Sequence, residues 1–102
     1  MPKLPSVSPK QILGLIEEQQ YRCALSGREL TPETASLDHA IPLSRGGAHD
    51  ITNVQVLDYQ VNSAKGTMTI DEFVTMCRAV AAHAERMAGT VDCVTVPPEA
   101  GG

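Results

Sequence analysis

Four polar residues in the middle of the chain have types and an order suited to hydrolytic chemistry. Asp38 and His39 are adjacent in the stretch LDHAIPLSRGGAHD, and Asn53 and Asn62 follow. A histidine titrates near neutral pH and can take a proton from water. Carboxylate and amide oxygens are hard ligands that suit Mg²⁺ or Mn²⁺. We therefore treat His39 as a candidate general base and Asp38 and Asn62 as candidate ligands of one metal ion, a combination that can hydrolyse phosphodiesters.

Two basic residues near this set are candidate contacts to nucleic acid. Arg45 precedes Gly46 and Gly47, where the lack of side chains would let a DNA strand come close to the backbone. Lys65 follows Asn62 by three residues, so on a helix both side chains would face the same way and meet the same phosphate. Ordinary alternatives stay open, because glycine pairs are common in flexible loops and lysines are common near helix C-termini.

The order of these residues resembles the HNH endonuclease family. The resemblance rests on the "DH" pair and on the "N…N..KG" pattern, with thirteen residues between His39 and Asn53 and eight between Asn53 and Asn62. It covers residues 21–66 and implies a ββα-metal module that cleaves DNA with a divalent ion. It also implies that Asn53, the middle asparagine, holds the loop and orients His39 through a hydrogen bond, and that Asn62 completes the catalytic set.

Helical patterns flank this region on both sides. Ser8 and Gln11 form a capping-box pattern around SPKQ, which predicts a helix over residues 9–21. Thr69 opens a second pattern of the same kind, which predicts a helix over residues 70–88. The resemblance implies that these two helices support the ββα core.

The region between the helices has the pattern strand, loop, strand, helix. LDHAI and NVQVL are short β-like runs, and DYQVNSAKG predicts a short helix with Asp58 as N-cap and Gly66 as stop. Neighbouring side chains of a regular strand point to opposite faces. Asp38 and His39 can therefore share one site only if the first strand bends or ends there, as Pro42 suggests.

We expect an α+β fold in which a ββα-metal (HNH) module is flanked by an N-terminal and a C-terminal helix. A chain of 102 residues with 42% hydrophobic residues fits one small domain. We place that single nuclease domain at residues 1–89 and a flexible tail, rich in proline and glycine, at residues 90–102.

The sequence departs from the family where many members hold a structural zinc ion with two Cys-x-x-Cys pairs. The first pair reads CALS here and the second reads DYQV, so three of four thiolates are missing and no structural zinc is expected. Asp58 instead caps the helix, and Leu25, Leu57 and Val61 are expected to pack where the zinc would lie.

Charge, cysteine content and apolar runs indicate which partners and which cellular location to expect. Eight basic and twelve acidic residues give a net charge of −4, which argues against general attraction to nucleic acid, so DNA contact must be local. Three cysteines without a paired pattern suit a reducing compartment. No apolar run is long enough for a membrane span or a secretion signal. We expect a cytoplasmic protein that binds DNA, does not contact a membrane, and works with a phage or restriction protein partner.

Alternatives of other classes remain open. The chain can be an HNH-fold DNA-binding or assembly module with little or no cleavage, acting in a phage packaging or restriction complex, which the acidic balance favours. A zinc-stabilised interaction domain is disfavoured by the missing cysteines. The "DH" pair alone can be a solvated acid beside a strand-end histidine. His49 and His83 lack matched partners in the pattern, and we interpret both as solvated surface residues.

Overall fold

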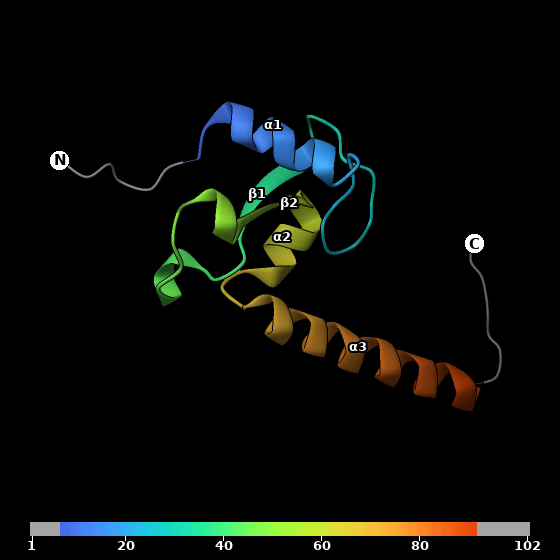
Figure 1. The fold of residues 1–102 in the computed structure, drawn as a ribbon. Coiled ribbons are helices and arrows are strands. Elements are labelled where there is room, and N and C mark those ends of the chain that lie inside the picture. The colour runs from blue at the N-terminus through green and yellow to red at the C-terminus, as the bar shows by residue number, and fades with distance from the viewer. Residues whose placement is uncertain (1–6, 92–102) are drawn as a thin grey trace. The chain divides into compact units, whose positions relative to one another are not determined.

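The computed structural model describes residues 7–91 and shows a small α+β protein (Figure 1). The elements in chain order are α1 (Pro9–Glu18), β1 (Ala35–His39), the 3₁₀ turns η1 (Leu43–Arg45) and η2 (Ile51–Asn53), β2 (Val54–Asp58), α2 (Tyr59–Lys65) and α3 (Ile70–Val91). The chain divides into two compact units, one ending at Ile70 and one beginning at Asp71, and each is described by itself. The predicted single domain over residues 1–89 stays a prediction.

The start of α1 is confirmed, whereas its end is earlier than predicted. The Ser8 hydroxyl accepts from the Gln11 backbone N–H at 3.1 Å, and the Gln11 side chain accepts from the Ser8 N–H at 2.9 Å. The helix stops at Glu18 because Gln19 turns its amide to β2, where it donates to the Val56 carbonyl at 2.8 Å and accepts from the Val56 N–H at 3.0 Å. The following residues, 20 and 21, take left-handed backbone angles that end the helix.

The predicted strand, loop, strand and helix are present. Strands β1 and β2 pair antiparallel, with Ala35 opposite Asp58 and His39 opposite Val54. Asp58 caps α2 by accepting from the Gln60 N–H at 2.9 Å, and α2 ends at Gly66 as predicted. In Figure 1 the strand pair lies between α1 and α2. Strand β1 ends at His39, which is the early end that a site shared by Asp38 and His39 requires.

The core of the first unit lies between α1, the strands and α2. The buried residues Cys23, Leu30, Val56 and Leu57 form its centre, and Ile12, Leu15, Ile16, Leu25, Ala35, Leu37 and Val61 pack against it. Burial of these apolar side chains is the main favourable term in folding. Leu25, Leu57 and Val61 thus pack in one apolar cluster with Cys23, and their predicted place in the position of a zinc ion stays a prediction.

Hydrogen bonds to the Cys23 thiol add to this packing. Burial raises the pKa of the thiol, but hydrogen bonds from the Ser26 side chain and from the backbone of Asp58, Ser26 and Leu25 outweigh it, so the pKa is lowered. The Ser26 N–H donates to the thiol at 3.4 Å and so holds the turn that follows Cys23. In the same region the Arg28 guanidinium lies 3.5 Å from the Asp58 carboxylate and 2.7 Å from the Gln60 side-chain oxygen.

The second unit, as far as the structure describes it, is the helix α3. It begins at Ile70, where the sequence predicts its start, and continues to Val91, three residues past the predicted end. The predicted tail over residues 90–102 otherwise lies outside the described residues. Over residues 7–91, none of the helices combines the length and apolar character needed to cross a membrane.

Candidate active site

The centre of the candidate site is a buried ion pair that the sequence did not suggest. The Lys65 ammonium lies 3.2 Å from Asp38 Oδ1 and donates to the His39 carbonyl at 3.1 Å. The other oxygen of Asp38 accepts from the Gln55 side chain at 2.9 Å. The Lys65 side chain is fully buried and that of Asp38 is 5% exposed. Lys65 of α2 thus bonds to the last two residues of β1.

Asn62 faces the same strand from one turn earlier in α2. Its side-chain nitrogen donates to Ser36 Oγ at 2.7 Å and to the Leu37 carbonyl at 3.1 Å. The sequence-based expectation that Asn62 and Lys65 share one helix face is confirmed. The face packs on β1, and the side-chain oxygen of Asn62 is the atom left to accept a ligand.

A polar pocket of about 250 Å³ brings three of the four predicted residues together. Asp38 and His39 reach it from the end of β1, and Asn62 reaches it from α2. The remaining wall comes from β1, from the loop after it and from the turn after α2, and it consists of Leu37, Pro42, Leu43, Ser44, Gly66 and Thr67. The pocket therefore holds a histidine, a carboxylate and an amide, the side-chain types that an acid–base group and two oxygen ligands require.

Asn53, the fourth predicted residue, lies at the base of the loop between the strands. Its side-chain oxygen accepts from the Ile41 N–H at 3.0 Å, and its nitrogen donates to the carbonyls of Ile41 at 3.0 Å and Ala48 at 2.8 Å. Its backbone carbonyl accepts from the Ala40 N–H at 2.8 Å. Asn53 thus holds the loop as predicted, but no hydrogen bond joins its side chain to His39 among the described residues.

His39 is hydrogen-bonded by a residue that the sequence analysis set aside. Its Nε2 lies 2.8 Å from Nδ1 of His49, with the two ring planes inclined at 46°. His49 is exposed, as its interpretation as a surface residue predicts, but its ring is bonded to His39, a partner that the sequence pattern did not indicate. The contact between His49 and His39 could have been expected from the topology alone, because antiparallel pairing of β1 with β2 makes the loop between them return toward His39.

The glycines of this loop serve its own folding. Gly46 has a φ of 90°, which favours glycine, and ends the turn η1. A Cβ atom on Gly47 would lie 1.7 Å from the Ile41 carbonyl oxygen and 2.9 Å from the Asn53 side-chain nitrogen. Close approach of the chain to itself therefore explains Gly47 without a DNA strand.

The two predicted nucleic-acid contacts have different surroundings. Arg45 is exposed at the edge of the pocket, and its guanidinium donates to the carbonyl of the pocket residue Thr67 at 3.2 Å. Lys65 leaves no surface for a phosphate in this structure, because its ammonium is buried against Asp38. Arg45 stays a predicted contact, and the geometry gives Lys65 the role of partner to Asp38.

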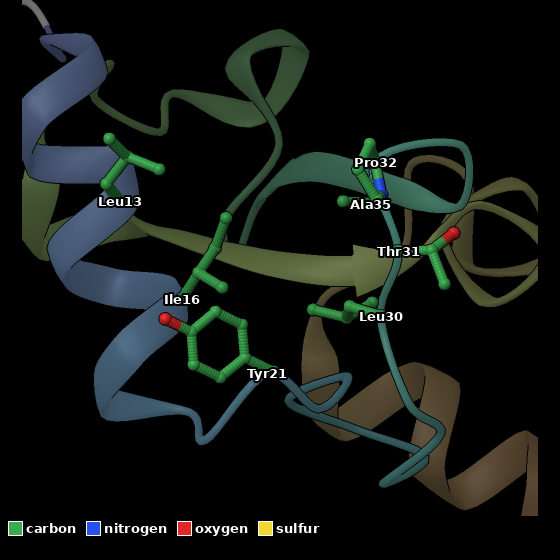
Figure 2. Close-up of a pocket in the computed structure, with 7 residues that line it drawn as sticks. All are labelled: Leu13, Ile16, Tyr21, Leu30, Thr31, Pro32 and Ala35. Carbon is green, nitrogen blue, oxygen red and sulfur yellow. The ribbon is translucent and has the colours of Figure 1, made fainter.

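Two further observations describe the surroundings of this pocket. Within residues 7–91, no three histidine, cysteine, aspartate or glutamate side chains converge in a way that could hold a metal ion. A second hollow, of about 300 Å³, lies between α1 and the segment before β1 (Figure 2). Leu13, Ile16 and Tyr21 face Leu30 and Pro32 across it, and no charged side chain lines it. The polar pocket is thus the better candidate for catalysis.

Comparison of the chain with models of known protein families and with curated protein sequences finds no match.

Proposed function

We propose that the chain is a divalent-metal-dependent DNA endonuclease of the HNH type. The observation that carries this proposal is the polar pocket, in which Asp38, His39 and Asn62 meet at the end of one strand and beside one helix. The order β1, loop, β2 and α2, with Asn53 tying the loop, supports a ββα-metal module. His39 is the proposed general base that takes a proton from the attacking water.

Asp38 and Asn62 offer the pocket's oxygen ligands for a hard divalent cation. Each Asp38 oxygen has one hydrogen-bond partner in the described structure and keeps a lone pair that could bind a metal ion. The side-chain oxygen of Asn62 is a second possible metal ligand. These two residues would hold Mg²⁺ or Mn²⁺. The cation would supply neutralisation of the charge that develops on the cleaved phosphate. Because Lys65 already neutralises Asp38, we expect weak metal binding that needs substrate phosphate to complete it.

The chain's own groups set up the remaining chemistry. The Lys65 ammonium bonds to the His39 carbonyl and so fixes the backbone that carries the base. Asn53 fixes the loop on the other side of His39. Arg45, at the pocket edge, is the proposed contact to the DNA backbone and orients the strand.

Cleavage of supercoiled plasmid tests this proposal. We expect conversion to nicked or linear DNA with Mg²⁺ or Mn²⁺, none with EDTA, and none with His39→Ala. His83→Ala is the matched control, since it removes an exposed histidine of α3 outside the polar pocket, and should cleave like the wild type. Intact plasmid with every metal, or equal cleavage by His39→Ala, would contradict the nuclease assignment.

One observation favours a second function, that of a DNA-binding or assembly module with little cleavage. Both oxygens of Asp38 are already hydrogen-bonded, and its side chain is 5% exposed, which makes it a poorly available ligand. Salt titration of DNA affinity separates the two functions. Tight binding that does not change with Mg²⁺ or EDTA, without cleavage, would favour the binding module.

A further inference from the structure

We propose that His49 is a positioning residue for His39, which it holds in the tautomer that a general base requires. This inference rests on the proposed nuclease function and deepens it, because it assigns the group that prepares the base.

The contact between the two rings is a hydrogen bond between specific nitrogens. His39 Nε2 and His49 Nδ1 are 2.8 Å apart, and the ring centroids are 5.0 Å apart at an angle of 46°, so the rings are not stacked. A neutral imidazole has one donor and one acceptor nitrogen. One ring must therefore donate the shared proton, and the choice fixes the tautomer of both.

Only one of the two arrangements leaves His39 able to act as a base. If His39 Nε2–H donates to His49, then Nδ1 of His39 keeps its lone pair, and within residues 7–91 that nitrogen has no hydrogen-bond partner. If His49 donates instead, Nδ1 of His39 carries the proton and the neutral ring has no lone pair left to accept another. The first arrangement puts both rings in the Nε2–H form.

Hydrogen bonds of the loop fix the backbone on both sides of His49. On one side of His49, the Ala48 carbonyl accepts from the Asn53 side chain at 2.8 Å. On the other side, Asp50 caps η2 by accepting from the Thr52 N–H at 2.8 Å. The neighbouring backbone is thus fixed at both ends, so the exposed ring meets His39 from a defined position. Asn53 then orients His39 through His49, which replaces the predicted direct hydrogen bond.

Initial rates of plasmid cleavage across DNA concentrations test the role of His49. His49→Ala should lower kcat by about 10- to 100-fold, the usual loss when a supporting group is removed, with KM changed less than about twofold. His49→Asn should restore most of kcat, because an asparagine oxygen can accept the His39 proton from nearly the same place. His83→Ala is again the control. A His49→Ala enzyme with wild-type kcat, or one that His49→Asn does not rescue, would overturn the proposal.

Nitrogen-15 NMR of the histidine rings gives a readout that does not require cleavage. We expect His39 to be in the Nε2–H form in the wild type and to become a mixture of tautomers in His49→Ala. An unchanged His39 tautomer would overturn the positioning role even if cleavage fell. If the wild type cleaves nothing with any metal, the nuclease proposal fails, and the NMR comparison still decides whether His49 controls the His39 ring.

Discussion

Replacing Lys65 by methionine tests whether the buried ion pair holds the site together. The substitution keeps a long, unbranched side chain in the same space but removes the charge. Asp38, 5% exposed, would then keep only the hydrogen bond from Gln55. A buried carboxylate without a cation is costly because the protein interior solvates it poorly.

The expected size follows from the distance and the burial. Two unit charges 3.2 Å apart attract by about 5 kcal/mol at an effective dielectric constant of about 20. Removing one partner of such a pair lowers the free energy of unfolding by about 3–5 kcal/mol. A domain of this size is stabilised by about 5–15 kcal/mol in total, so Lys65→Met should lose a large share of its stability.

Urea unfolding followed by circular dichroism measures this effect, since the chain has no tryptophan. Lys10→Met, which changes an exposed lysine of α1, is the matched control and should shift stability by less than about 0.5 kcal/mol. The double variant with Asp38→Asn and Lys65→Met should recover most of the loss, because neither charge is then left alone. A Lys65→Met protein as stable as the control, or a double variant no more stable than Lys65→Met, would refute the reasoning.

Three further predictions concern the loop, the DNA contact and the buried thiol. Gly47→Ala should lower the free energy of unfolding by about 1–3 kcal/mol, because its Cβ would overlap the Ile41 carbonyl. Gly14→Ala is the control in α1, where the space around the Cβ is open, and it should raise the free energy of unfolding by about 1 kcal/mol. Thermal melts of the two variants measure the difference. Arg45→Ala should weaken DNA binding and reduce the salt slope of the affinity by about 1, as measured by titration at several salt concentrations; an unchanged slope would exclude the phosphate contact. Because folding lowers the pKa of the Cys23 thiol, its contribution to stability is fully present above the pKa of the unfolded thiol and disappears as the pH falls through the folded pKa. Urea titrations at several alkaline pH values should show this dependence in the wild type and not in Cys23→Ser.

Short-range features of the fold were predictable because they depend on hydrogen bonds between residues close in sequence. The capping box of Ser8 and Gln11 and the Asp58 cap of α2 are of this kind, and each has the expected hydrogen bonds. The end of α1 was not predictable, because Gln19 leaves the helix to bond with Val56, thirty-seven residues away. Contacts of that range depend on how the chain packs and leave no local pattern.

The same distinction applies to the candidate site. The types and order of Asp38, His39 and Asn62 predicted three side chains that do line one pocket. Their contacts were missed, because Lys65 was predicted to meet a phosphate rather than Asp38 and His49 was interpreted as a solvated surface residue. Lys65 is buried because α2 packs on β1, and His49 meets His39 because the loop returns along its own start. Both facts follow from the pairing of elements rather than from spacing along the chain.

The closed base of the loop between β1 and β2 determines which of its residues can change independently. Hydrogen bonds from Asn53 tie both arms near His39, whereas the tip at η1 lies beyond these ties. Leu43 and Ser44 in the tip also line the polar pocket. Substitutions at the tip should therefore alter what enters the pocket without moving the histidine at its base. If the pocket cleaves DNA as proposed, residues of the loop tip can change, and with them the preferred substrate, while Asp38, His39 and Asn62 keep their geometry.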